Sequence, residues 1–218
     1  MAGESRSHTG PAGRTEQAGP VARRARTPSR DIHAALVEAA EAVLVREGPA
    51  AVTVRAVATE AGVAPMGVYN RFGSKDGLIE MLLMRGFAGL RDAVLAPGVH
   101  DPVERLRRSG ERYREFALTH PRHYAIMFEG ALEPGAFSAE LTEIAGASFG
   151  ALVDHVANAM AAGAVRPGDP REAAQLIWSA VHGAVTLELH EICQVDDPAA
   201  NYRLLLELLI RGLTSPVA

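Results

Sequence analysis

Four side chains between residues 53 and 75 have the chemistry to bind phosphate groups. Thr53 and Lys75 stand where helices are expected to begin, and the free backbone N–H groups of a helix start favour an anion. Lys75 is also the only lysine in the chain. Tyr69 lies one position beyond the expected buried face of its helix, so its hydroxyl is directed toward the edge of that helix. Together with Arg71, these residues predict a clamp for the phosphate backbone of a nucleic acid.

Two short helices must position these side chains. Thr53 can cap a helix over residues 54–61. Pro65 can open a second helix that ends at Phe72. Because so short a pair cannot bury much apolar surface alone, it needs a third helix, which the spacing of apolar residues predicts between Ser29 and Gly48. The three elements predict a helix-turn-helix unit.

Longer helices are expected in the rest of the chain, since no stretch has the alternating pattern of a strand. Ser74 can cap a helix that runs to about Leu95. The later helices are expected over residues 101–119, 121–130, 137–162, 170–193 and 198–213. We therefore predict an all-α fold in three parts: a disordered basic arm over 1–28, a helix-turn-helix domain over 29–76 and a larger helical domain over 77–218.

The composition is that of a globular protein. The chain has 218 residues, of which 48% are apolar and 22% charged. No apolar run approaches the roughly 20 residues that a membrane span needs, and the N-terminus lacks the apolar segment of a secretory signal. We expect a cytoplasmic protein without membrane contact. The one cysteine, Cys193, has no partner for an internal disulfide and is expected to be buried.

The charge is unevenly distributed. The first 30 residues carry a net +4, which leaves −8 for the rest of a chain whose total is −4. A basic arm on an acidic body is typical of a protein that contacts phosphates at one end. Arg24 and Arg26, next to the first helix, are candidate DNA contacts, although a solvated tail explains them equally well.

The stretch "TVRAVATEAGVAPMGVYNRFGSKDGL", from Thr53 to Leu78, resembles the DNA-binding segment of the tetracycline-repressor (TetR) family of transcriptional regulators. The matching pattern is Thr-x-x-x-x-Ala-x-x-Ala-Gly-Val, then Tyr-x-x-Phe, then Lys-x-x-Leu. The resemblance implies that the clamp residues touch phosphates and that Arg55 reaches a base. Downstream, "WSAVHG" is similar to the Trp-x-x-x-His-Gly signature of one class of C-terminal domain in this family.

The chain departs from the family where many members have Ser or Thr, because Ala64 and Pro65 offer few hydrogen-bond donors. We expect base contacts to come from other residues. Arg55 can bond a guanine edge, and Met66 can press on a thymine methyl unless it packs against the first helix. Asn70 is a third candidate. Gly67 would let the backbone approach DNA closely, or would merely avoid a clash.

The last helix indicates a homodimer. Its sequence "NYRLLLELLIRGL" is apolar around nearly the whole circumference, which a surface helix cannot be. One face can pack on its own domain, and the other requires a partner. Joined by the preceding helix, it predicts a four-helix dimer interface, the arrangement that the resemblance implies, with a fully buried last helix in a monomer as the alternative. A two-fold dimer would bind a palindromic operator in double-stranded DNA.

The resemblance also implies a pocket for a small-molecule effector in the larger domain. Aromatic and thioether side chains are dense there, although such stripes equally well form ordinary core. The candidate ligand-binding residues are Tyr113, Phe116, His123, Met127, Phe128, Phe149, Trp178 and His182. No cofactor and no bound metal are expected.

These observations predict a ligand-responsive regulator, by default a repressor, in which an effector tilts the helix that starts at Lys75. The alternatives are a metal-responsive regulator that uses His182, Glu188 or His190, and an architectural DNA-binding protein without an effector. Enzymatic activity is not expected, because the sequence has no nucleophile elbow, phosphate loop or dinucleotide fingerprint.

Overall fold

The computed structural model describes residues 29–130 and 137–214 of the chain. Within these ranges the backbone forms nine α-helices and one short 3-10 helix, and no strand. This confirms the predicted all-α fold. The elements are α1 (Ser29–Glu47), η1 (Pro49–Ala51), α2 (Val54–Glu60), α3 (Pro65–Phe72), α4 (Lys75–Val94), α5 (Pro102–Thr119), α6 (Pro121–Phe128), α7 (Ala139–Ala161), α8 (Pro170–Leu189) and α9 (Pro198–Thr214).

The predicted capping residues fix the short helices at one end of the molecule. Thr53 Oγ1 accepts a hydrogen bond from Ala56 N at 3.2 Å and starts α2. Ser74 Oγ accepts one from Gly77 N at 3.1 Å and starts α4. Between them, α3 opens at Pro65 and ends at Gly73, whose φ of +71° suits glycine. Each boundary therefore has a local cause in the sequence.

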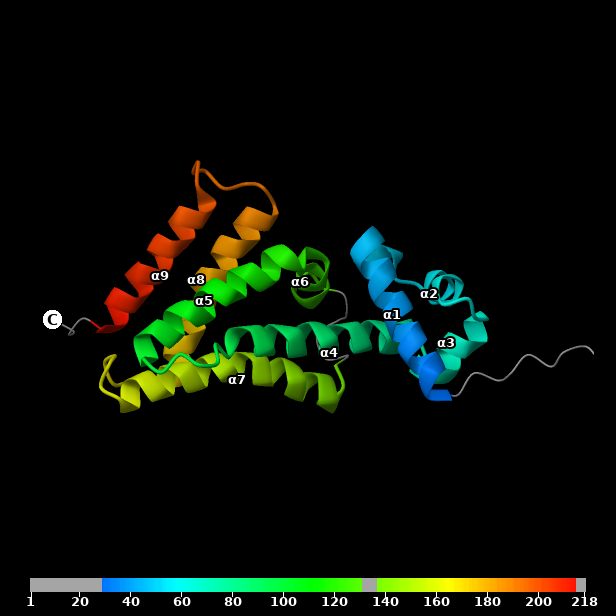
Figure 1. Ribbon diagram of the computed structural model, residues 1–218, viewed down its shortest axis with the longest axis horizontal. Coiled ribbons are helices and arrows are strands. Elements are labelled where there is room, and N and C mark those ends of the chain that lie inside the picture. The colour runs from blue at the N-terminus through cyan, green and yellow to red at the C-terminus, as the bar shows by residue number, and fades with distance from the viewer. Residues whose placement is uncertain (1–28, 131–136, 215–218) are drawn as a thin grey trace, which may run out of the picture.

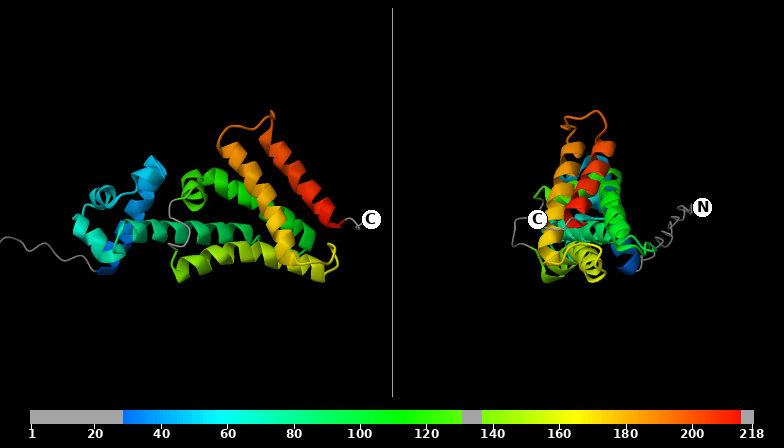
Figure 2. Two further views of the ribbon diagram at one scale, coloured as in Figure 1. Left: turned by 180° about the vertical axis from the view of Figure 1, so that it is seen from behind. Right: turned by 90° about the vertical axis from the view of Figure 1, so that its left-hand side faces the viewer.

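Figure 1 shows how α4 links the two ends of the molecule: it leaves the α1–α3 cluster and runs into the helical body. In the body, α4 packs most extensively on α7, which lies alongside it. Helices α5 and α6 cover the opposite side. Figure 2 shows α8 and α9 side by side at the end far from α1–α3. The α1–α3 cluster and the last two helices are thus at opposite ends of the long axis.

One apolar core runs through both ends. It includes Leu36 of α1, Val57 of α2 and Val68 of α3, all fully buried, and it continues without interruption through Leu78 and Leu82 of α4 into the body. A smaller cluster around Leu106, Val156 and Leu213 closes the far end. The core therefore crosses the boundary at residue 76 that the sequence predicts between two domains.

The end of α8 differs from the prediction, which extended this helix to residue 193. The helix stops at Leu189, and Glu191 adopts a left-handed φ of +57°. Its N–H donates to Glu188 O at 3.0 Å, and Ile192 N–H donates to Leu187 O at 3.1 Å. This is a Schellman motif, which usually has glycine at the left-handed position. Because glutamate occupies it here, the sequence gives no stop signal.

Candidate functional site

Helix α3 presents one face to solvent. Val68 is fully buried in the apolar core, while Met66 is 65% exposed and Tyr69 is 48% exposed. The exposure of Met66 shows that it does not fill a gap beside the first helix. Asn70 and Arg71 are also exposed. The chemically distinct side chains of α3 thus gather on the face that points away from the core.

Gly67 lies on the same helix and is not needed for packing. A Cβ atom added there would lie 3.6 Å from Val63 Cγ2, an ordinary van der Waals contact. The explanation that glycine avoids a clash therefore does not hold. Gly77, by contrast, must be glycine, because a Cβ atom there would lie 2.0 Å from Phe72 O. This close approach lies at the junction of α3 and α4, and it could not be predicted from the sequence.

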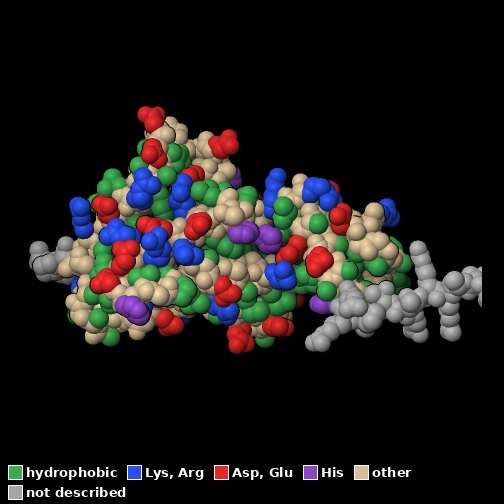
Figure 3. All heavy atoms as spheres, viewed as in Figure 1, with side chains coloured by type: hydrophobic (Ala, Val, Ile, Leu, Met, Phe, Trp, Pro, Cys, Tyr) green, Lys and Arg blue, Asp and Glu red, His purple; other side chains and the backbone are tan. Residues whose placement is uncertain are grey.

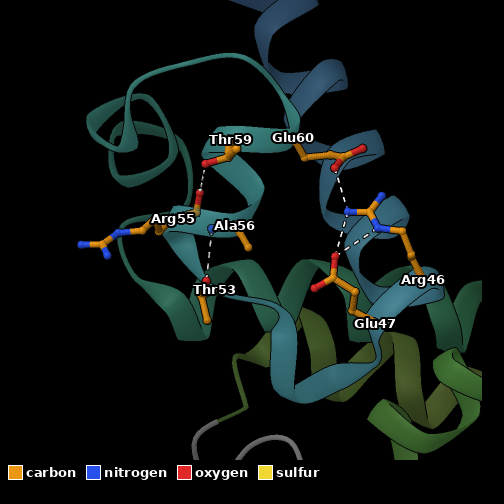
Figure 4. A network of polar contacts seen from close by, with 7 residues as sticks. All are labelled: Arg46, Glu47, Thr53, Arg55, Ala56, Thr59 and Glu60. Atoms are coloured by element: carbon orange, nitrogen blue, oxygen red, sulfur yellow. Dashed lines mark hydrogen bonds and ion pairs between the residues drawn. The ribbon is translucent and has the colours of Figure 1, made fainter.

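Figure 4 shows the start of α2, where Thr53 and Arg55 lie. The Thr53 hydroxyl accepts from Ala56 N, so its own hydrogen stays available for an external acceptor. The Arg55 side chain extends away from the protein in this view. Arg46 of α1 is instead paired with carboxylates of the protein: it contacts Glu47 at 2.9 Å and Glu60 at 2.8 Å. Of these two contacts, the one with Glu60 joins α1 to α2.

Lys75 is exposed in the first turn of α4, directly after the Ser74 cap. Thr53, Arg55, Tyr69, Arg71 and Lys75 are therefore all exposed and all belong to the α2–α3–α4 segment. Arg24 and Arg26 lie outside the described residues. The arrangement provides hydroxyl groups and cations around one exposed helix, which is the chemistry of a protein–DNA contact.

A cavity of about 320 Å³ lies in the body between α4, α5, α7 and α8. Four of the predicted ligand-binding residues line it: Tyr113, Phe128, Phe149 and Trp178. The other lining residues are Phe87, Leu90, Val94, Leu106, Ser109, Gly110, Ala145, Ser148, Leu152, Ile177 and Val181. The α4 residues among them were missed because a helical apolar stripe does not reveal whether it faces core or cavity.

The remaining predicted ligand-binding residues pack outside the cavity. Phe116 stacks on His120 with ring centroids 4.9 Å apart. Met127 fills the space beside Gly86, where an added Cβ atom would lie 2.7 Å from its Sδ. His123 approaches Glu41 of α1 at 3.8 Å. His182 lies behind the cavity wall, within a hydrogen-bonded cluster.

That cluster joins α5, α6 and α8. Trp178 Nε1 donates to Tyr113 Oη at 3.3 Å, Tyr113 Oη and Tyr124 Oη are 3.0 Å apart, and Tyr124 Oη is 2.6 Å from His182 Nδ1. Burial lowers the pKa of His182, which favours the neutral ring. Burial also raises the pKa of Tyr113 far above its usual value. The polar groups of this wall are therefore uncharged at neutral pH.

Glu188 and His155 of the body each have a hydrogen-bond partner within the protein. Glu188 accepts a hydrogen bond from Arg114 Nε at 2.8 Å, and His155 Nε2 is 3.0 Å from Val94 O. In residues 29–130 and 137–214, no three His, Cys, Asp or Glu side chains form a group that could hold a metal ion. Figure 3 shows acidic and basic side chains interspersed over one face of the body.

Helices α8 and α9 leave large apolar side chains exposed. Tyr202, Leu206 and Leu213 of α9 are buried against the body, as the predicted inner face requires. On the other side, Leu208 is 55% exposed, and the further exposed apolar residues of this end are Leu176, Leu187, Ile192, Val195 and Leu204. None of the described helices has the length and apolar character to cross a membrane.

An exposed helix-turn-helix on an all-helical body with a cavity defines a DNA-binding transcriptional regulator. Residues 36–82 match the family described as bacterial regulatory proteins, tetR family, and residues 106–212 match the tetracyclin repressor-like C-terminal domain. The chain belongs to the TetR family of transcriptional regulators. The narrower resemblance of "WSAVHG" to one class of C-terminal domain stays a prediction.

The chain is similar to several known proteins, two of them by sequence and two by structure. The HTH-type transcriptional regulators Rv1816 of Mycobacterium tuberculosis H37Rv and Mb1846 of Mycobacterium bovis are each 28% identical to this chain, over 75% of it and 83% of the relative. A structure of a protein with unknown function from Rhodococcus sp. RHA1 has a TM-score of 0.77 at 26% identity, over 84% of this chain and 96% of that one. The structure of FadR from Bacillus subtilis in complex with stearoyl-CoA has a TM-score of 0.67 at 21% identity, over 83% of this chain and 99% of that one.

Proposed function

We propose that this regulator represses transcription as a homodimer, and that a small molecule in the body cavity releases it from a palindromic operator. The main support for this proposal is the position of α4. The first turn of α4 holds Lys75 at the DNA-binding end, while Phe87, Leu90 and Val94 of the same helix line the cavity. A ligand that displaces the cavity wall therefore acts on a helix whose other end adjoins the proposed DNA contact.

In the DNA complex, α3 lies in the major groove. Thr53, Tyr69, Arg71 and Lys75 contact phosphates, which position the helix. Base contacts come from Arg55, Met66 and Asn70, with Gly67 allowing the backbone to approach. The DNA-binding part comprises residues 29–76, and residues 77–218 form the ligand-binding and dimerisation part.

The dimer forms through α8 and α9. Leu204 and Leu208 of one protomer would pack against the same helices of its partner, giving a self-complementary two-fold interface. The two α3 helices would then contact half-sites about one DNA turn apart, ~34 Å, or a multiple of it.

Release requires only modest coupling between the two sites. A coupling free energy of about 1–3 kcal/mol changes affinity by roughly 5- to 150-fold. The complex of FadR with stearoyl-CoA supports this part of the proposal, since a protein of the same fold holds a small molecule. A tilt of α4 would change the separation of the two α3 helices, so that both could not occupy their half-sites together.

The proposal is tested by DNA binding of the purified protein to fragments from upstream of its own gene and its neighbours, across a salt series. Wild-type protein should bind one fragment tightly and with strong salt dependence. Arg55→Ala should relax the sequence preference, and Tyr69→Phe should weaken binding to all fragments alike. Arg91→Ala is the matched control, because this exposed arginine lies at the far end of α4 beside Asp92. Sequence-independent binding by all four proteins would overturn the proposal and favour an architectural protein.

A further inference from the structure

The walls of the effector cavity carry no charge. Its lining residues are apolar except for Ser109, Tyr113, Ser148 and Trp178, and no Asp, Glu, Lys, Arg or His is among those that the structure describes. A charged group that entered would lose its hydration without gaining a counter-ion, which is strongly unfavourable. The cavity volume of about 320 Å³ lies at the lower end of the usual range for ligand pockets, roughly 300–1,000 Å³. These walls therefore select a small, uncharged molecule.

Most of the polar groups in the walls already have partners. Ser148 Oγ donates to Ala145 O at 2.7 Å. Trp178 Nε1 donates to Tyr113 Oη, which in turn belongs to the cluster with Tyr124. These bonds use the hydrogen of Ser148 and that of Trp178, so neither offers a donor to a ligand.

Ser109 is the exception. It is only 3% exposed, it lines the cavity, and its hydroxyl makes no hydrogen bond to any residue that the structure describes. Because Ser109 precedes Tyr113 by four residues in α5, both hydroxyl groups lie on the same face of that helix. Among the described residues, Thr186 Oγ1 is the only side-chain nitrogen or oxygen atom that is both fully buried and without a partner, so Ser109 Oγ is accessible from the cavity and can bond a ligand oxygen there.

We propose that the effector is an uncharged, mainly apolar molecule with one hydroxyl or carbonyl oxygen, and that this oxygen hydrogen-bonds to Ser109 Oγ. This inference rests on the proposed function, in which the cavity holds the effector. The aromatic side chains of Phe87, Phe128, Phe149 and Trp178 enclose the apolar part. Tyr113 adds a second hydroxyl beside the ligand oxygen.

A carboxylic acid is the competing ligand class, because the guanidinium group of Arg171 lies just outside the cavity. Beyond Phe149 and Trp178 is a shallow groove that contains Arg171, whose guanidinium carbon lies 5.5 Å from the Phe149 ring centroid. Asp169 and Glu172 line the same groove. Two carboxylates against one guanidinium make the groove unfavourable for an anion, and this favours the uncharged ligand.

Trp178 makes the inference directly measurable, since it is the only tryptophan in the chain and lies in the cavity wall. The full-length protein is titrated with 1-octanol, octane and octanoate, and tryptophan fluorescence is recorded. We expect saturable binding of 1-octanol at least tenfold tighter than that of octanoate. Ser109→Ala should weaken 1-octanol about fivefold, the effect of one hydrogen bond, and leave octane unchanged. Thr142→Ala is the control and should leave both affinities within about twofold, because this exposed hydroxyl lies outside the cavity and bonds to Ser138 O.

Three outcomes would overturn the inference. Octanoate binding as tightly as 1-octanol, with the binding lost in Arg171→Ala, would make the effector a carboxylic acid. Equal weakening of octane and 1-octanol by Ser109→Ala would assign Ser109 a packing role. No saturable fluorescence change with any probe would mean that the cavity does not bind this class.

Operator binding, measured separately, tests the proposed function independently. If 1-octanol binds as expected but every cavity ligand leaves operator binding intact, the release step fails and the inference on ligand class stands. If only charged compounds release the operator, the proposed function stands and the inference fails.

Discussion

Gly67 and Gly77 stand ten residues apart and are expected to respond oppositely to the same substitution. Gly77→Ala should destabilise the protein by about 1–3 kcal/mol, because the new Cβ atom would overlap Phe72 O at the α3–α4 junction. Gly67→Ala should leave stability unchanged or raise it by up to about 1 kcal/mol, since alanine is favoured in a helix and has room there. Urea denaturation of the two variants measures both effects.

Operator binding completes this comparison. Since we propose that the backbone at Gly67 approaches DNA, Gly67→Ala should weaken operator binding although the variant is fully folded. A Gly67→Ala protein with wild-type affinity would contradict the close approach, and a Gly77→Ala protein of wild-type stability would contradict the packing described at the junction.

One buried and two partly buried histidines give stability a defined pH dependence. Burial is the main cause that lowers the pKa of His123, His155 and His182 below the ordinary value of 6.5. The unfolded chain therefore binds more protons than the folded protein at mildly acidic pH, so the free energy of unfolding should fall as pH drops below about 6.5. Urea denaturation between pH 5 and 8 measures this slope, using the pH range in which histidine titrates. His155→Gln should reduce the slope, and a flat profile for the wild type would contradict the prediction.

At the scale of elements, the end of α8 is strained because Glu191 adopts a left-handed backbone conformation. A substitution can remove this strain. A non-glycine residue in this conformation costs about 1–2 kcal/mol, partly offset by the larger conformational freedom of glycine in the unfolded chain. Glu191→Gly should therefore stabilise the protein by about 0.5–1 kcal/mol, as measured by thermal denaturation. Glu191→Ala is the control, because alanine keeps the Cβ atom and should bring no gain.

The same helix end shows which elements the sequence can predict. Thr53, Pro65 and Ser74 are local signals, and the helices that they start were predicted at the observed residues. The end of α8 depends on Glu191, a residue that ordinarily continues a helix, so the prediction ran on to residue 193. Local signals determine boundaries only where the residue type matches the conformation that it adopts.

The exposed face of α3 and the cavity also differ in how well they can be predicted from the sequence. The exposure of Tyr69 could be predicted, because the period of one helix decides which side chains face away from its core, whereas the sequence left open whether Met66 packs against the first helix. The cavity could not be predicted, because it depends on how far α4 stands from α5, α7 and α8. Phe116 and Phe128 are both aromatic, yet only Phe128 lines the cavity, and nothing in their own positions distinguishes them.

At the scale of the whole molecule, the exposed apolar end of α8 and α9 should determine the oligomeric state. Leu208→Glu would place a charge at the centre of the proposed interface, so we expect a folded monomer by analytical ultracentrifugation. Operator affinity should fall by more than tenfold, because each protomer would then bind only one half-site. Leu118→Glu, on the exposed side of α5, is the control and should remain dimeric. A dimeric Leu208→Glu protein would place the interface elsewhere.

The core that continues from Leu36 through Leu78 and Leu82 has a consequence for engineering. An operator specificity cannot be transplanted by exchanging residues 29–76 alone, because the buried side of α1–α3 packs on α4 residues beyond that boundary. A hybrid regulator joined at residue 76 would face a mismatched surface, whereas one joined after Leu82 would carry both halves of that contact together. The segment that has to be exchanged as one piece is therefore longer than the helix-turn-helix and includes the first turns of α4, up to Leu82.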